Sequence, residues 1–170
     1  MSRKAGLPPV WRPDARLLIL GSLPGEMSLA ASRYYGNPRN AFWRLLESVG
    51  CKDLQSFAYE DRLEALKTAG IALWDVIAEA ERPGSLDGAI RDESPNDLAG
   101  LIARLPALRA VAFNGGKAAT LGRKVLAGVA PDVARITLPS SSPAYTLAFE
   151  RKAAAWAELR RPLGLVVDRP

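Results

Sequence analysis

The chain of 170 residues contains no histidine and one cysteine, Cys51. The missing histidine removes the commonest general acid and base of enzymes, and with it the Ser-His-Asp triad and most zinc chemistry. A single cysteine also excludes an internal disulfide, a cysteine-ligated iron–sulfur cluster and a Cys-rich zinc site. Any catalysis must therefore use Asn, Asp, Glu, Ser, Tyr, Lys or Arg, so positioned amides, hydroxyls and carboxyls are the groups to look for.

The stretch from Gly21 to Trp43, GSLPGEMSLAASRYYGNPRNAFW, is the richest in such groups. It follows a strand-like apolar run and ends in an amphipathic helical pattern. Between the two lie two Pro/Gly turns, a tyrosine pair and two asparagines. A connection of this length is uncommon as a passive linker, and loops at strand ends often carry binding and catalytic groups. We therefore interpret this loop as a site.

Within the loop, Asn40 either caps the helix that follows or orients a water and stabilises a developing cation. An amide is no general base at neutral pH, so its contribution is positional and electrostatic. Tyr34 and Tyr35 either form a stacking platform for a flat ligand, at about 1–3 kcal/mol per nucleobase, or one of them simply belongs to the core. The segment from Gly21 to Gly25 allows close approach of the backbone to a ligand, but it lacks the phosphate-binding P-loop pattern. A structural turn is its alternative role.

Three further polar patches follow apolar runs later in the chain. Asp75 can accept hydrogen bonds from a ligand, bias a water or cap a turn. Asn114 can hydrogen-bond to the polar edge of a ligand, or it can simply adopt the left-handed backbone conformation beside a glycine. Ser140–Ser142 places hydroxyls and backbone N–H groups at a helix start, which makes either an anion site or ordinary capping by Ser142.

Hydrophobic patterning places these patches on a sheet. Buried strands are predicted at 16–20, 71–75, 109–113 and 133–138. Helices are predicted over 42–49 and 59–69, from a Ser94 cap onward, after 116, and through the segment holding Tyr145 and Trp156. This alternation indicates an α/β protein with a mostly parallel sheet covered on both faces. Ligands bind beyond the carboxyl ends of such strands, which here are Gly21–Gly25, Trp74–Asp75, Asn114–Gly115 and Pro139–Ser142. We expect all four to meet at one rim.

The chain length predicts one domain, over 16–161, preceded by a basic, loosely ordered arm at 1–15 and followed by a tail at 162–170. The net charge of +5 allows a polyanionic partner. No apolar run is long enough for a membrane span and no signal peptide is evident, so a soluble cytoplasmic protein is expected.

The motifs GSLPG, YYGNPRNAFW, LWDV and LPSSSPA, in this order, resemble the uracil-DNA glycosylase superfamily, most closely its hypoxanthine-DNA glycosylase branch (family 6). The resemblance covers about residues 16–160. It implies a three-layer α/β/α fold around a four-stranded, mostly parallel sheet. Members of the superfamily flip a damaged base out of DNA and hydrolyse its N-glycosidic bond, which leaves an abasic site. The resemblance therefore implies no metal and no cofactor.

Residue by residue, the resemblance gives Asn40 the catalytic, water-positioning role, with Asn37 as second choice. Leu23 stands where several relatives carry a water-activating polar residue, so it cannot serve. Leu138 stands where uracil-specific members carry a histidine, which argues against a highly efficient uracil enzyme. Tyr35 matches the aromatic residue that stacks on the flipped base.

The remaining expected contacts divide between the base and the DNA backbone. The resemblance implies that the base lies near Gly21, Ser22, Leu23, Asp75 and Asn114. It implies that the flanking phosphates are held by Ser140, Ser141, Ser142 and neighbouring basic residues such as Arg39. Tyr145 is a candidate for the wedge that fills the gap in the base stack.

These features predict a monofunctional glycosylase for deaminated bases in double- or single-stranded DNA, with hypoxanthine preferred over uracil or xanthine. A monomer associated with the nucleoid is expected. One alternative is the same fold acting mainly on uracil. The other is a non-catalytic α/β module that binds nucleic acid or nucleotides.

Overall fold

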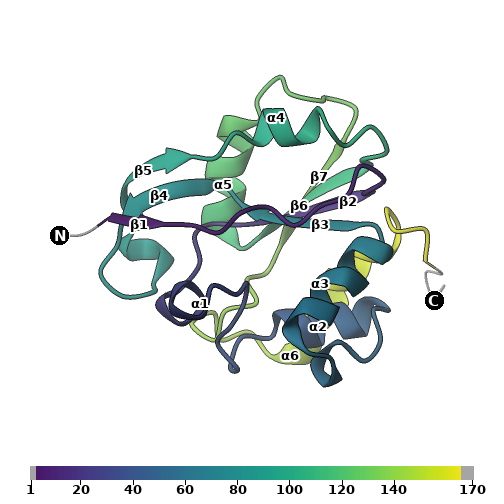
Figure 1. Ribbon diagram of the computed structural model, residues 1–170, viewed down its shortest axis with the longest axis horizontal. Coiled ribbons are helices and arrows are strands. Elements are labelled where there is room, and N and C mark those ends of the chain that lie inside the picture. Colours follow the sequence, from purple (N-terminus) through teal and green to yellow (C-terminus); the bar gives the residue numbers. More distant parts are fainter. Residues whose placement is uncertain (1–2, 166–170) are drawn as a thin grey trace.

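The computed structural model of the protein describes residues 3–165, and its centre is a four-stranded parallel sheet in the order β3-β2-β6-β7 (Figure 1). The strands are β2 (Leu17–Gly21), β3 (Ile71–Asp75), β6 (Ala110–Asn114) and β7 (Ala134–Leu138). Every residue of the two central strands, β2 and β6, is buried. Helices cover both faces of the sheet, which explains why these strands are continuously apolar rather than alternating.

The helices form the two outer layers. On one face lie α2 (Phe42–Val49), α3 (Tyr59–Thr68) and α6 (Phe149–Trp156), with the short 3-10 segments η1 (Leu54–Ser56) and η3 (Ala157–Arg160). On the other face lie α4 (Leu98–Ile102) and α5 (Gly116–Val125). Leu17 and Ile19 of β2 pack into the first layer, whereas Leu18 and Leu20 pack into the second. The predicted three-layer α/β/α fold and its four-stranded sheet are confirmed.

The strand register places the predicted site segments at the same end of the sheet. Gly21 at the end of β2 pairs with Asp75 at the end of β3, and Asn114 at the end of β6 pairs with Leu138 at the end of β7. The site loop then leaves β2, forms the short helix α1 (Glu26–Ala31) and reaches α2. The four loops that carry the predicted site residues therefore start from the same edge of the sheet.

A second sheet, which the sequence did not reveal, lies beside the first. It is antiparallel, in the order β1-β4-β5, and consists of β1 (Arg3–Ala5), β4 (Ile77–Glu81) and β5 (Arg91–Pro95), with η2 (Asp87–Ala89) between the last two strands. β1 belongs to the arm that we expected to be loosely ordered. That expectation is wrong for its described part, because β1 pairs with β4 and the carbonyl of Leu7 accepts hydrogen bonds from Trp74 and Tyr34.

Some predicted element boundaries also need correction. Ser94 and Pro95 belong to β5, and the cap of α4 is Asp97, whose side chain accepts from the Gly100 N–H. Tyr145 precedes α6, which begins at Phe149. In the predicted tail, Leu163 is buried in the core, and residues 166–170 lie outside the described part of the chain. Within residues 3–165 no helix has both the length and the apolar character that crossing a bilayer requires.

Candidate active site

A cavity of about 760 Å³ opens at the carboxyl ends of the parallel strands. It collects residues from each of the predicted loops: Gly21, Ser22, Leu23, Tyr35, Asn40, Asp75, Asn114, Ser140, Ser141 and Ser142. Arg39 is exposed and does not line it. The expected convergence on one rim is therefore found, although the tasks assigned to the individual residues remain predictions.

Asn40 lies at the start of α2 and reaches the cavity. Its Oδ1 atom accepts a hydrogen bond of 3.0 Å from the backbone N–H of Phe42, the first residue of that helix. The N-cap itself is Ala41, so the prediction of Asn40 as the cap is one residue off. The Ala41 N–H in turn donates to the carbonyl of Ser141, at 3.0 Å. The side chain of Asn40 is thereby held in place, and its amide nitrogen and the second lone pair of Oδ1 remain for a ligand or a water.

Tyr35 is held in an uncommon backbone conformation beside Asn40. Its φ is 52°, in the left-handed region that bulky residues rarely adopt. Three contacts fix it there: its ring stacks on Phe42 with centroids 3.8 Å apart, its carbonyl accepts from Trp43 Nε1, and its hydroxyl accepts from Asn114 Nδ2. Because Phe42 covers one face of the ring, a flat ligand can stack only on the other. Tyr34 is buried in the core, as the alternative interpretation expected for one member of the pair.

Asn114 connects the end of β6 to the serine turn. Its Nδ2 atom donates to Ser141 Oγ at 2.9 Å and to the Tyr35 hydroxyl at 3.1 Å, and its Oδ1 accepts from the Ser141 N–H at 2.9 Å. Both groups of the amide are therefore engaged with the protein itself. These bonds fix the relative positions of Tyr35 and Ser141. That Asn114 also hydrogen-bonds to the edge of the base stays a prediction.

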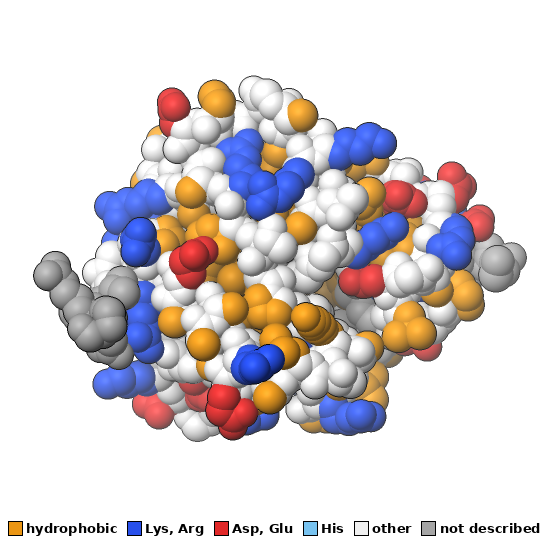
Figure 2. All heavy atoms as spheres, turned by 180° about the vertical axis from the view of Figure 1, so that it is seen from behind, with side chains coloured by type: hydrophobic (Ala, Val, Ile, Leu, Met, Phe, Trp, Pro, Cys, Tyr) orange, Lys and Arg blue, Asp and Glu red, His pale blue; other side chains and the backbone are white. Residues whose placement is uncertain are grey.

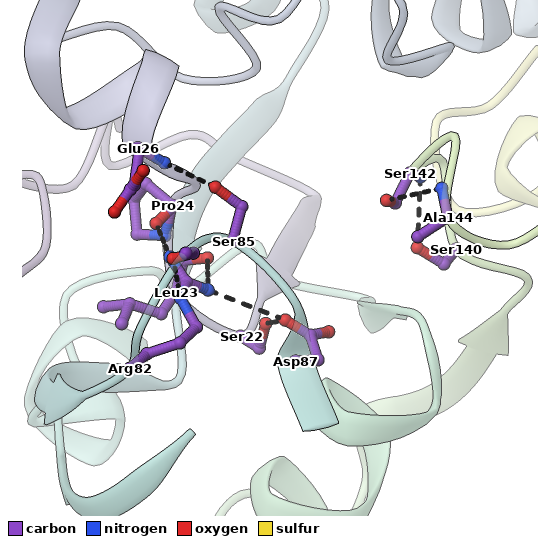
Figure 3. A network of polar contacts seen from close by, with 11 residues as sticks. Ser22, Leu23, Pro24, Glu26, Arg82, Ser85, Asp87, Ser140, Ser142 and Ala144 are labelled. Carbon is purple, nitrogen blue, oxygen red and sulfur yellow. Dashed lines mark hydrogen bonds and ion pairs between the residues drawn. The ribbon is translucent and has the colours of Figure 1, made fainter. Parts of the chain in front are cut away.

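The serine turn is internally bonded and backed by a buried lysine. Ser140 Oγ accepts from the Ser142 N–H, and Ser142 Oγ accepts from the Ala144 N–H (Figure 3). The Lys152 ammonium donates to the carbonyl of Ser142 at 3.1 Å and lies 5.4 Å from the centre of the Tyr145 ring. Burial lowers the pKa of Lys152. A cation behind a turn of this kind favours an anionic ligand on its open side.

The opposite wall of the cavity comes from the connection between β4 and β5, which the sequence suggested only as a polar turn. Ser85, Leu86, Asp87, Gly88, Ala89 and Arg91 line it. Leu86 is 62% exposed at this wall, and Tyr145 is 43% exposed elsewhere in the cavity lining. The only sequence signal for this wall was its Pro/Gly-containing polar composition, which is common to many surface turns.

This wall is bound to the Gly21–Gly25 loop by a buried guanidinium (Figure 3). Arg82 is 2% exposed and donates to the carbonyls of Leu23, Pro24 and Gly84. Ser22 Oγ donates to Asp87 Oδ1 at 2.6 Å, and that same oxygen lies 3.9 Å from Arg82 Nη1. Leu23 packs in a small apolar cluster with Ile77, Ala80 and Ile90. The loop is consequently fixed by polar contacts made far along the chain.

Asp75 differs from every other polar group of the cavity. It is 4% exposed, and its Oδ2 is the one buried side-chain nitrogen or oxygen among residues 3–165 that lacks a hydrogen-bond partner. Burial, and then the negative charge of Asp87, raise the pKa of Asp75 to about 7, while the positive charge of Arg82 acts in the opposite direction. The end of β3 is itself well fixed, because Asn96 Nδ2 donates to the Asp75 carbonyl at 2.9 Å.

The described residues hold no group of three or more His, Cys, Asp or Glu side chains that could bind a metal ion. Lys and Arg side chains are spread over the face in Figure 2, with Asp and Glu side chains between them, so this face carries no continuous basic patch.

The chain is similar to known proteins in both sequence and fold. Residues 8–160 match the family model of the uracil DNA glycosylase superfamily. The chain belongs to this superfamily. A hypoxanthine DNA glycosylase from Methanosarcina barkeri is 42% identical over 156 residues, which cover 92% of this chain and 97% of the relative. A hypoxanthine DNA glycosylase from Methanosarcina acetivorans is 40% identical over 158 residues, which cover 93% of this chain and 98% of the relative.

A solved structure shares the fold as well. The solution NMR structure of a candidate uracil DNA glycosylase from Methanosarcina acetivorans superimposes with a TM-score of 0.85 at 40% identity, over 96% of this chain and 99% of that one. The resemblance inferred from the sequence motifs, to the superfamily and to its hypoxanthine branch, is confirmed.

Proposed function

We propose that this protein is a DNA glycosylase that removes deaminated bases, hypoxanthine first, by hydrolysing the N-glycosidic bond and leaving an abasic site. Membership of the superfamily and two relatives named hypoxanthine DNA glycosylase support this proposal. The observation that carries it to this chain is the cavity that gathers Asn40, Tyr35, Asp75 and Ser140–Ser142. Its 760 Å³ falls within the usual range for sites that enclose a small ligand, and is ample for one everted nucleotide.

In the proposed mechanism the target nucleotide leaves the duplex and enters the cavity. Everting it costs a few kcal/mol, and less at the weak pairs that deamination creates. The base stacks on the face of Tyr35 that Phe42 does not cover. The serine turn, with Lys152 behind it, binds a flanking phosphate, and such contacts make binding dependent on salt. Arg39 on the neighbouring surface adds a backbone contact.

Hydrolysis then proceeds at the sugar. As the N-glycosidic bond lengthens, positive charge develops on the sugar, and a water held by Asn40 attacks C1′. The hydrogen bond from the Phe42 N–H fixes the Asn40 amide before the substrate arrives, so little reorganisation is needed at the moment of reaction. No lysine nucleophile takes part, and borohydride should trap no imine between protein and DNA. Trapping in high yield would contradict this mechanism.

The test is a panel of otherwise identical duplexes and single strands, each with one inosine, uracil or xanthine, scored for abasic sites under single-turnover conditions. The expected result is fastest release from inosine. Faster release from uracil would favour the alternative of a uracil enzyme, and no release from any lesion would favour a non-catalytic binding module. Gel filtration of the free protein and of its DNA complex tests the expected monomer.

A further inference from the structure

We propose that Asp75 is the proton donor to the departing base, so that the protein is a general acid catalyst as well as a positioner of water. This inference rests on the proposed function and adds a second reacting group to it. Asp75 lines the cavity beside Tyr35, and it is the described residue whose buried carboxyl oxygen has no hydrogen-bond partner.

The surroundings of Asp75 favour a neutral carboxyl. A buried carboxylate is stable only when donors or cations compensate its charge. None of the hydrogen bonds in the cavity reaches this side chain: Ser22 donates to Asp87, the Asn114 amide is bonded to Tyr35 and Ser141, and Arg82 is bonded to three carbonyls. With Oδ2 unpartnered, the proton-bearing form avoids the cost of a buried, uncompensated charge.

The charged and titratable groups around Asp75 act in the same sense. Asp87, from the wall between β4 and β5, adds a negative charge that favours protonation, whereas Arg82 at the end of β4 opposes it more weakly. Tyr35 and Tyr34, from the site loop, are neutral because burial raises the pKa of both well above its usual value. The pKa of about 7 for Asp75 therefore lies where a general acid works best at neutral pH.

The end of β2 leaves room for this carboxyl. A Cβ atom on Gly21 would lie 2.5 Å from Asp75 Oδ1 and 3.0 Å from the Tyr35 hydroxyl. Asp75 and Tyr35 thus both lie next to a residue without a side chain, and all three line the cavity. Of the two acids at this place, Asp75 is the stronger by far, because the pKa of Tyr35 is raised while that of Asp75 falls near neutrality.

The departing base needs such a donor. When the bond between C1′ and the base nitrogen breaks, its electron pair stays on the base, and a proton from Asp75 neutralises the developing anion at a ring nitrogen or the 6-oxygen of a 6-oxopurine. The oxygen of the attacking water forms the new bond to C1′. The proton that this water loses returns through solvent to the Asp75 carboxylate, so the step consumes only water. No histidine is present in the sequence to do this work.

The test is the pH profile of the single-turnover rate constant on an inosine duplex, for the wild type, Asp75→Asn and the exposed control Asp61→Asn. The asparagine keeps the size and hydrogen-bonding capacity of the side chain but has no acidic proton to transfer. For the wild type and the control, the rate constant should fall about tenfold per pH unit above about pH 7. Asp75→Asn should be roughly 10²-fold slower at about pH 6 and should lack this break in the profile.

A second variant separates proton donation from a merely structural role. Asp87→Asn removes the negative charge that raises the Asp75 pKa, so the break in the wild-type profile should move to lower pH. A wild-type profile that stays flat between about pH 6 and about pH 9, or an Asp75→Asn profile that follows the wild type, would overturn the inference. If the wild type releases no base at any pH, the proposed function fails instead, and the two failures are thus distinguished.

Discussion

On one side of the cavity, Asn114 is bonded through both groups of its amide to Tyr35 and Ser141, whereas on the other side Asp75 keeps a buried oxygen without any partner. Both residues end parallel strands of the same sheet, and both are at least nine-tenths buried. A buried polar group with its bonds made contributes to the shape of the protein, whereas one without them costs free energy. We infer that Asn114 shapes the cavity and that Asp75 acts in it.

The largest expected effect is the dependence of folding stability on pH that Asp75 causes. The pKa of Asp75 is about 7 in the folded protein against 3.8 for an ordinary aspartate. The folded protein therefore holds a proton that the unfolded chain releases between these two values, so folding becomes less favourable as the pH rises through this window. Above about pH 7 the penalty reaches its full value, which is about 4 kcal/mol at most.

Asp75→Asn removes this titration. Its free energy of unfolding, relative to the wild type, should rise from acid pH towards about pH 7 and then level off. Urea denaturation of both proteins at several pH values measures the difference. A difference that does not change with pH would mean that Asp75 is charged or compensated in the folded protein, contrary to the comparison.

The next effect concerns turnover. Asn40→Ala should lower the single-turnover rate constant by roughly 10²-fold, as expected for loss of one preorganised hydrogen-bonding group. Binding of lesion-containing DNA should change little, and loss of the bond to the Phe42 N–H should cost about 1 kcal/mol of stability. Asn37→Ala, three residues away in the same loop, is the matched comparison. Equal losses in both variants would mean that Asn37 shares the water-positioning role, and unchanged turnover in Asn40→Ala would leave Asn40 with a helix-start role only.

A smaller effect on stability is expected at Asn114, the fully bonded residue of the comparison. Asn114→Ala leaves the Ser141 N–H and the Tyr35 hydroxyl without their partner, which should cost about 1–3 kcal/mol of stability. The loss should vary little with pH, unlike that at Asp75, because no acid is removed. Thermal unfolding followed by circular dichroism measures it. Unchanged stability together with a large loss of activity would instead indicate that Asn114 reads the base.

The smallest effect is expected outside the cavity. Arg39 is exposed, and its proposed phosphate contact contributes through release of counterions. In Arg39→Ala, the slope of log affinity against log salt concentration should fall by about 0.9 for duplex DNA, with turnover at saturation unchanged. Arg12→Ala, at an exposed arginine paired with Asp14, is the control. An unaltered slope would remove Arg39 from the DNA contact surface.

The parts of the fold that depend on local pattern were predicted well. The helix at Phe42–Val49 and the strand at Ile71–Asp75 match the predicted ranges, because their apolar residues recur at helical spacing or form a short buried run. The rim was also predictable, since parallel strands must end at the same edge. The N-terminal arm and the β4–β5 wall were missed, because their order comes from pairing and bonding to segments far away in the chain.

Arg82 illustrates why. An arginine in a turn-forming stretch normally indicates an exposed side chain, yet this one is buried against carbonyls of the Gly21–Gly25 loop, nearly sixty residues earlier. Tyr35 is similar: its identity suggested stacking, but its left-handed backbone and its contact with Asn114 depend on three separate segments meeting. Neither arrangement leaves a periodic signal in the sequence.

The sequence by itself determined the fold class, the superfamily and the polar residues that follow the four parallel strands, because hydrophobic periodicity and motif order are properties of neighbouring residues. Only the tertiary structure decided which of those residues are bonded to one another and which is left without a partner. Partnership, burial and the pKa of a buried acid depend on groups that chain folding brings together, so the difference between Asn114 and Asp75 exists only in the folded protein.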